Sequence, residues 1–94
     1  MKEHRYWVYI ITNPTHTVLY IGVTSNIHAR IEQHKEGAVE GFTKKYNCKK
    51  LIYTEETDYI HAALAREKQL KGWTRKKKEN LITSLNPEWK ELDV

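Results

Sequence analysis

The sequence predicts an α+β fold in which a small three-stranded antiparallel sheet is flanked by helices, in the order ββαβαα. Runs rich in β-forming residues occupy positions 6–12, 18–24 and 51–55. The first two runs are separated by a turn that the Asn13-Pro14 step marks, so they should form a hairpin. Segments with helix-capping residues follow the second and third runs, and one small sheet covered by helices is the architecture that this order favours.

Gly22 lies near the end of the second predicted strand. A glycine in a strand often marks a place where another group must approach the backbone closely. The sequence does not fix the register of the two hairpin strands, and a slip of one residue would move each side chain to the other face. The sequence therefore does not fix the positions of Tyr9 and Tyr20 relative to one another.

The first predicted helix spans about residues 27–36, with Ser25-Asn26 as its N-cap and Gly37 as its stop. Residues 37–50 are polar and contain glycine, so we expect a loop there. The second predicted helix is capped by Thr57-Asp58, runs to about Lys71 and ends at Gly72. The third is capped by Thr74 and spans about residues 75–85, and Asn86-Pro87-Glu88 turns the chain out of it.

Length and composition predict one domain, residues 1–94, with room for a single modest core. The formal net charge of +4 favours an anionic partner. Cys48 is the only cysteine and forms no internal disulfide, and the N-terminus lacks the apolar stretch of a signal peptide. These features predict a reducing, cytoplasmic location. No segment approaches the ~20 apolar residues of a membrane span, so we expect no membrane partner.

Basic residues are concentrated in two places, and the larger group lies between positions 68 and 78. It comprises Lys68, Lys71, Arg75, Lys76, Lys77 and Lys78. Cations in the first turn of a helix oppose its macrodipole, whereas a bound phosphate would reverse that balance. The smaller group, Lys44 and Lys45, lies beside Phe42 and Tyr46 and could hold phosphates and stack a base. The alternative for each group is an ordinary solvated surface.

The first predicted helix carries polar residues on its apolar face. Ile27, Arg30, Ile31 and His34 are spaced i, i+3, i+4 and i+7, which places them on one stripe. A charged residue there is costly unless it is paired or lines a cleft. Arg30 could instead extend to the edge of the sheet, and His34 could be a hydrogen-bonded core histidine. Two such residues on one stripe, directly after Tyr20 and Gly22, favour a functional site.

Glu67 interrupts the apolar stripe of the second predicted helix in the same way. A carboxylate facing the sheet is costly to bury without a partner, and either Arg30 or a metal ion would provide one. A single carboxylate can hold Mg²⁺ when water and substrate phosphate supply the other oxygen ligands.

These residues, in this order, resemble the GIY-YIG nuclease superfamily, in its short stand-alone bacterial branch. The two name-giving motifs correspond to Trp7-Val8-Tyr9 and Tyr20-Ile21-Gly22, followed by Arg30, by Glu67 within a segment that runs from Ala65 to Trp73, and by Asn86. The resemblance covers about residues 5–90. The chain departs from the family pattern at Trp7-Val8, where name-giving members have Gly-Ile, and these positions are structural.

The resemblance implies hydrolysis of a DNA phosphodiester with a single metal ion. Tyr9, or alternatively Tyr20, would deprotonate or orient the attacking water. Arg30 would stabilise charge on the phosphate, and Glu67 would hold Mg²⁺ or Mn²⁺. His34 would relay a proton or bind phosphate, and Asn86 would brace the cleft.

The function that we expect is a metal-dependent DNA endonuclease, structure-selective and acting in repair or recombination. Many relatives attach this module to a second domain, so a protein partner is a possible source of substrate choice. Two alternatives remain open. One is a nucleic-acid-binding module without catalysis, which would bind in a salt-dependent way and release no product. The other is a small nuclease subunit that depends on a larger assembly.

Overall fold

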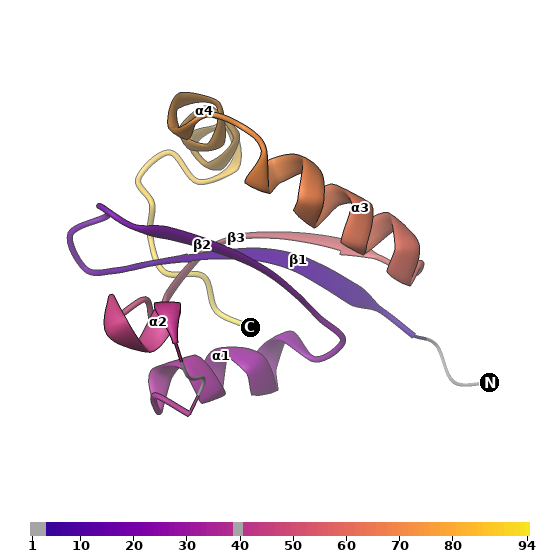
Figure 1. Cartoon of the computed structure of the whole chain (residues 1–94), viewed down its shortest axis with the longest axis horizontal. Helices are drawn as coiled ribbons and strands as arrows, with labels where there is room; N and C mark the ends of the chain where they lie inside the picture. The colour runs from indigo at the N-terminus through magenta and orange to yellow at the C-terminus, as the bar shows by residue number, and fades with distance from the viewer. Residues whose placement is uncertain (1–3, 39–40) are drawn as a thin grey trace.

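A computed structural model describes residues 4–38 and 41–94 and shows a sheet with helices on both faces (Figure 1). The strands are β1 (Tyr6–Thr12), β2 (Leu19–Thr24) and β3 (Lys50–Thr57), and the helices are α1 (Ile27–Lys35), α2 (Phe42–Lys45), α3 (Ile60–Lys71) and α4 (Arg75–Leu85). Helices α1 and α2 cover one face of the sheet, and α3 and α4 cover the other. The predicted α+β fold with a three-stranded antiparallel sheet is confirmed.

Strand β1 lies in the centre of the sheet and pairs antiparallel with β2 and with β3. Its register places Tyr9 opposite Gly22 and Ile11 opposite Tyr20. Directly opposed residues share a face, and side chains alternate with a period of two. Tyr9 and Tyr20 therefore both face the layer that contains α1, which resolves the register that the sequence left open.

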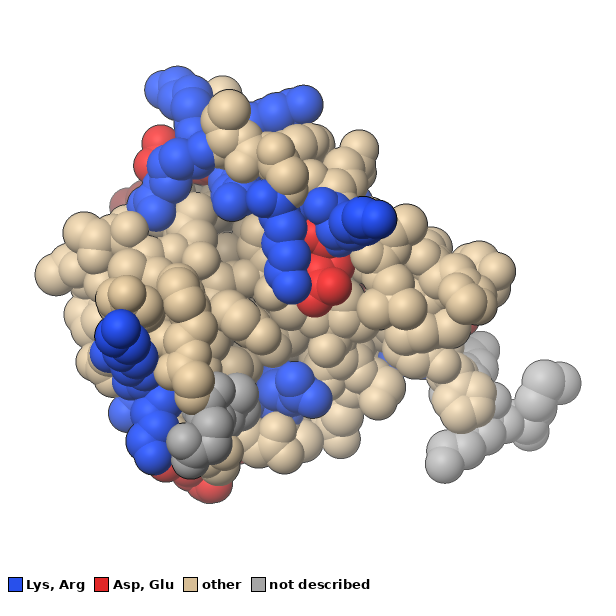
Figure 2. Space-filling model, in the orientation of Figure 1, with Lys and Arg blue, Asp and Glu red and all other residues tan. Residues whose placement is uncertain are grey.

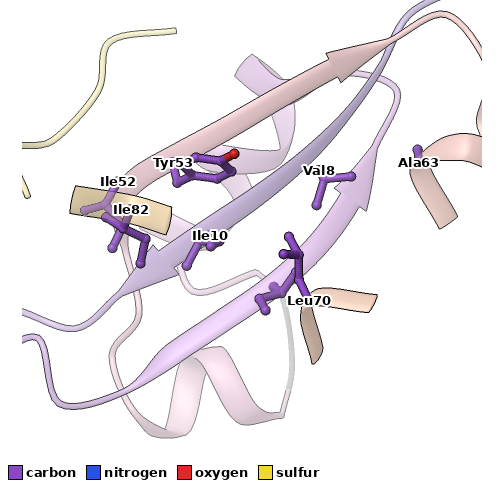
Figure 3. Close-up of a cluster of buried hydrophobic side chains, with 8 residues drawn as sticks. Val8, Ile10, Ile52, Tyr53, Ala63, Leu70 and Ile82 are labelled. Atoms are coloured by element: carbon purple, nitrogen blue, oxygen red, sulfur yellow. The ribbon is translucent and has the colours of Figure 1, made fainter. Parts of the chain in front are cut away.

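The core between the sheet and the α3–α4 layer is apolar (Figure 3). Its buried members are Val8, Ile10, Ile21, Ile52, Tyr53, Ala63, Leu70 and Ile82. Alternate residues of β1 supply this face, as expected for a central strand that is buried on both sides. The indole rings of Trp73 and Trp89 pack at the rim of this cluster.

The second core lies between the sheet and α1. Its buried members are Tyr9, Ile11, Ile27, Ile31, Cys48 and Leu51. The C-terminal tail, residues 87–94, leaves α4 on one side of the sheet and joins this core on the other, because Leu92 packs against it and donates its backbone N–H to the carbonyl of Leu51 at 2.8 Å. Burial raises the pKa of the Cys48 thiol.

Two of the predicted helix caps are confirmed. The side chain of Asn26 accepts a hydrogen bond from the backbone of Ala29 at the start of α1. The hydroxyl of Thr74 accepts one from the backbone of Lys77 at the start of α4, at 3.2 Å. Each cap satisfies one of the backbone donors that a helix N-terminus leaves unpaired.

Two local predictions were wrong. The segment predicted as a loop over residues 37–50 contains the short helix α2. Thr57 is the last residue of β3, paired with Tyr6, and the N-cap position of α3 is Tyr59, which makes no side-chain cap. The longer strand explains the second difference, because its pairing with β1 holds Thr57 in extended backbone.

No helix within residues 4–38 and 41–94 is long and apolar enough to cross a membrane.

Candidate active site at the edge of β2

The side chain of Tyr9 crosses the neighbouring strand at Gly22. A β-carbon built on Gly22 would lie 2.5 Å from the Tyr9 hydroxyl oxygen and 2.6 Å from the ring carbon that bears it. No other residue type fits at this position unless Tyr9 moves. The close approach that Gly22 predicted is thus confirmed, and the approaching group is a tyrosine of the same sheet. Because β2 is an edge strand, the Tyr9 hydroxyl is directed toward the edge of the sheet.

His34 links Tyr9 to α2 through a buried chain of hydrogen bonds. Its Nε2 lies 3.0 Å from the Tyr9 hydroxyl, and its Nδ1 lies 3.2 Å from the hydroxyl of Thr43. All three side chains are buried. Burial, and then the nearby positive charge of Arg30, lower the pKa of His34, so the imidazole is neutral at pH 7. A neutral imidazole has one donor and one acceptor nitrogen, and both are used here.

Thr43 belongs to this hydrogen-bonded series of side chains, and the sequence did not predict its role. It lies on α2, within the segment predicted to be a loop. A threonine between a phenylalanine and two lysines in a polar stretch carries no periodic signal that would mark it as buried. The sequence could point to Thr43 only through the need of a buried His34 for a second hydrogen-bond partner.

Several of the predicted site residues affect the pKa of Tyr9. The pKa of Tyr9 is raised to about 12, mainly by burial and then by the proximity of Tyr20, while Arg30 acts in the opposite direction and Glu67 adds a small upward effect. Arg30 comes from α1, whereas Glu67 comes from α3 on the other side of the sheet. Arg30 thus acts on the Tyr9 hydroxyl from the α1 layer, and Glu67 acts on it only through its charge, from the opposite layer.

Tyr20 forms the outer wall of this site. Its ring centre lies 6.4 Å from that of Tyr9 and 5.9 Å from that of His34, and its side chain is half-buried. The three rings form one aromatic cluster, with Tyr9 and His34 enclosed and Tyr20 in contact with solvent.

Glu67 is paired with a lysine of its own helix. Its carboxylate lies 3.4 Å from the Nζ of Lys71, one turn further along α3, and its side chain is 22% exposed. The sequence predicted Arg30 or a metal ion as the partner. An ion pair of this kind contributes only about 0.3–0.5 kcal/mol, so Lys71 is easily displaced.

A carboxylate that is partly open to solvent and weakly paired fits a hydrated divalent cation. Within residues 4–38 and 41–94, no group of three or more His, Cys, Asp or Glu side chains could hold a metal ion. The donor set therefore suits an ion that is bound by one carboxylate and takes its other oxygens from water and substrate phosphate.

Asn86 has contacts that belong to a different part of the fold. Its side-chain amide donates to the carbonyls of Ile52 and Lys90, at 3.0 and 2.8 Å, and its carbonyl accepts from the backbone of Lys90. These bonds fasten the start of the C-terminal tail to β3. The contacts link Asn86 to the scaffold behind the site and not to the cluster around Tyr9.

The predicted basic residues form two groups that Figure 2 shows on one face of the molecule, over the α3–α4 end and over α2. Lys77 lies over the indole of Trp73, with its Nζ 4.4 Å from the ring centre. Arg75 pairs with Glu79 at 2.9 Å and donates to backbone carbonyls of the β1–β2 turn. The remaining predicted members, Lys44, Lys45, Lys68, Lys71 and Lys76, are exposed, and Lys78 is half-buried.

The fold places the chain among small α+β domains with a three-stranded antiparallel sheet between two layers of helices. Residues 5–80 match the family described as the GIY-YIG catalytic domain, and the chain belongs to this family. The resemblance drawn from Tyr9, Tyr20, Arg30 and Glu67 is confirmed at this level. The family is a nuclease family, for which DNA is the implied substrate.

Relatives of similar size align over most of the chain. A UPF0213 protein from Natronomonas pharaonis is 34% identical over 77 residues, which cover 82% of this chain and 89% of the relative. A UPF0213 protein from Limosilactobacillus reuteri is 33% identical over 84 residues, 87% of this chain and 86% of the relative. The solution NMR structure of a UPF0213 protein from Bacillus halodurans has a TM-score of 0.59 and 25% identity, and the match covers 90% of this chain and 89% of that one.

Proposed function

We propose that this protein is a DNA endonuclease that depends on a divalent metal ion and hydrolyses phosphodiester bonds. The observation that carries the proposal is the cluster around the Tyr9 hydroxyl, where a neutral imidazole, a guanidinium and a carboxylate from three different positions act on one phenol. A core would not require these groups together. Hydrolysis of a phosphodiester requires a water-orienting group, a cation for the phosphate and a ligand for a metal ion.

We assign the orientation of the attacking water to Tyr20, whose hydroxyl would take up the proton of the water as it passes its own proton to the Tyr9–His34 pair. Family resemblance favours Tyr9 for the water contact, but Tyr9 is fully buried, and its raised pKa keeps it a neutral phenol. Tyr20 is the phenol in contact with solvent. Behind it, neutral His34 has an acceptor nitrogen for the Tyr9 hydroxyl, so the pair can take up a proton without forming a free tyrosinate.

Arg30 and Glu67 act on the phosphate. The guanidinium of Arg30 stabilises the negative charge that builds on the non-bridging oxygens as the water attacks. Glu67 would hold Mg²⁺ or Mn²⁺ when bound, which would supply Lewis-acid stabilisation of the leaving oxygen. Asn86 supports the site indirectly, by fixing β3 and the tail that pack behind it.

The two basic groups bind the DNA backbone in this proposal. Contacts from lysine and arginine to phosphate fix the position of the DNA but carry no sequence information. Selectivity would then come from the shape of the DNA or from a protein partner. We propose that the activity serves repair or recombination, where branched or damaged DNA occurs, and that it has a cytoplasmic location, which the single cysteine favours.

The test is cleavage of labelled single-stranded, duplex, flap and branched DNA with Mg²⁺, with Mn²⁺ and with EDTA. Glu67→Gln should abolish cleavage while circular dichroism and thermal unfolding remain unchanged. Glu79→Gln is the matched control, because Glu79 also pairs with a cation one turn away on its own helix but lies outside the site. Cleavage that survives EDTA, or that Glu67→Gln and Glu79→Gln affect equally, would refute the proposal.

The second candidate function is nucleic-acid binding without catalysis, which the exposed lysines of α3 and α4 favour. Salt-dependent binding to every DNA in the panel, with no product under any metal condition, would support it instead.

A further inference from the structure

A strip of aromatic rings extends from the candidate active site onto the surface of α2. We call Tyr20, Phe42 and Tyr46 the aromatic strip. The ring centres of Tyr20 and Phe42 lie 6.1 Å apart, and those of Phe42 and Tyr46 lie 4.8 Å apart. Phe42 is 47% exposed and Tyr46 is 41% exposed. Single exposed aromatic side chains are common, but adjacent ones that continue out of a functional site indicate a binding surface.

The strip is held in place by the site itself. Thr43 points inward from α2 and hydrogen-bonds His34, while its neighbours Phe42 and Tyr46 point outward. The backbone is fixed as well, since the carbonyl of Thr43 accepts from the backbone of Cys48 at 2.8 Å and that of Phe42 accepts from Tyr46 at 3.0 Å. The outward rings therefore keep a fixed position relative to the groups around Tyr9.

A cation accompanies the rings. The Nζ of Lys45 lies 5.4 Å from the ring centre of Tyr46. Lys44 is exposed on the same short helix, and Figure 2 shows basic side chains over α2. An apolar peptide would gain nothing from such cations, whereas a polyanion with flat aromatic groups would use both the charges and the rings.

We propose that the aromatic strip is a stacking subsite for an unpaired base beside the scissile phosphate. Tyr20 belongs to both the site and the strip, so a base stacked on Phe42 has its own phosphate at the site and the next base near Tyr46. In a duplex the base faces are covered by neighbouring bases and are not available to Phe42. The substrate class is thus DNA with unpaired nucleotides at the cut, such as a single strand, a flap or a bulge. This inference rests on the proposed function and names its substrate.

Binding in EDTA tests the subsite separately from cleavage. Fluorescence anisotropy would compare a single-stranded 16-mer with a hairpin duplex of the same composition. Phe42→Leu and Tyr46→Leu keep apolar side chains but remove the rings, and each should weaken single-strand binding roughly 5- to 150-fold with little effect on the duplex. Tyr59→Leu is the matched control, because Tyr59 is an exposed aromatic residue at the start of α3. It should leave both affinities unchanged.

A direct readout of stacking comes from 2-aminopurine placed at successive positions of the 16-mer. Its fluorescence should be quenched at one or two positions by the wild-type protein and not by Phe42→Leu. Equal losses for single strand and duplex, or losses from Tyr59→Leu as large as those from Phe42→Leu, would overturn the subsite. If Phe42→Leu binds the single strand and quenches 2-aminopurine as the wild-type protein does, the subsite would likewise be overturned.

The two proposals fail in different ways. If the wild-type protein cleaves DNA but the ring variants bind normally, the nuclease function stands and the subsite falls. If stacking is observed but no DNA is cleaved with any metal, the subsite stands as a binding site and the nuclease function falls.

Discussion

The hydroxyl of Tyr9 occupies the space that a side chain at position 22 would fill. These two residues face each other across β1 and β2, and a β-carbon on Gly22 would lie 2.5 Å from the Tyr9 oxygen. The tyrosine of the first motif thus requires the glycine of the second, and the two motifs form one structural unit. This relationship explains why a glycine is needed in the middle of an otherwise β-branched and aromatic strand.

Gly22→Ala should therefore displace the Tyr9 hydroxyl from His34. We expect cleavage to slow about 100-fold, since a shift of about 1 Å at a catalytic group has effects of that size. The strain should also lower the free energy of unfolding by about 1–3 kcal/mol. Gly72→Ala is the control, because a β-carbon there meets nothing closer than 3.5 Å. Normal cleavage by a folded Gly22→Ala protein would contradict the role given to Tyr9.

Thr43→Val removes the second partner of His34 without a large change in volume. A buried nitrogen left without a partner costs about 1–3 kcal/mol of stability, whereas Thr43→Ser keeps the hydroxyl and should behave like the wild-type protein. Urea unfolding measures the cost, and ¹⁵N chemical shifts of the imidazole report which nitrogen of His34 carries the proton. A mixture of tautomers in Thr43→Val, and one tautomer in Thr43→Ser, is the expected result.

The depressed pKa of His34 predicts loss of both stability and cleavage in mild acid. The unfolded chain takes up this proton near pH 6.5, whereas the folded chain takes it up at lower pH. The free energy of unfolding should therefore decrease as the pH falls below 6.5, until the folded state is protonated as well. Cleavage should fall about tenfold per pH unit below the folded pKa, since only neutral His34 accepts a proton.

Measurements in a His16→Gln background isolate this effect. Burial, Lys50 and Arg75 also lower the pKa of His16, which would add a second acid-sensitive group. NMR titration of the His34 ring should then follow the pH profile of cleavage. Cleavage that stays constant while His34 becomes protonated would exclude it as the proton acceptor.

The exposed lysines of α3 and α4 should contribute to DNA binding through charge alone. Replacing Lys68 or Lys76 with glutamine should weaken binding to all DNA sequences alike and reduce the slope of log K against log salt by about 1 for each residue. Lys90→Gln is the control, because Lys90 pairs with Glu88 in the C-terminal tail. If Lys68→Gln and Lys90→Gln change the slope of log K against log salt equally, Lys68 on α3 makes no phosphate contact.

Arg66 precedes Glu67 in sequence but has a structural role. Its guanidinium donates to both carboxylate oxygens of Glu55 at 2.9 Å and lies over Trp73, and Glu55 also accepts from Tyr53. Burial alone would raise the pKa of Glu55, but hydrogen bonds from Arg66 and Tyr53 bring it below its usual range. Arg66→Met should lower the free energy of unfolding by about 1–2 kcal/mol, because the pair is partly exposed.

Cleavage by the folded Arg66→Met protein at low temperature should equal that of the wild-type protein. A loss of cleavage as large as that of Glu67→Gln, without loss of stability, would assign Arg66 to the site and contradict this role.

The sequence predicted those parts of the fold that depend on local signals. Strand β1 follows from a continuous run of β-formers, and Asn26 and Thr74 cap their helices because their side chains reach backbone donors three residues on. Arg30 and His34 were found because polar residues on an apolar stripe are a local anomaly. Thr43 and the Lys71 partner of Glu67 were missed, since neither interrupts a pattern within its own segment.

The tail from Pro87 to Val94 connects the two helix layers around the sheet. Asn86 fixes its start on β3, and beyond Leu92 the carbonyl of Val94 lies 3.0 Å from Nδ1 of His28 on α1. Arg30 lies on α1 in one layer and Glu67 lies on α3 in the other. The tail thus holds together the two layers that carry these residues, through hydrogen bonds at both of its ends.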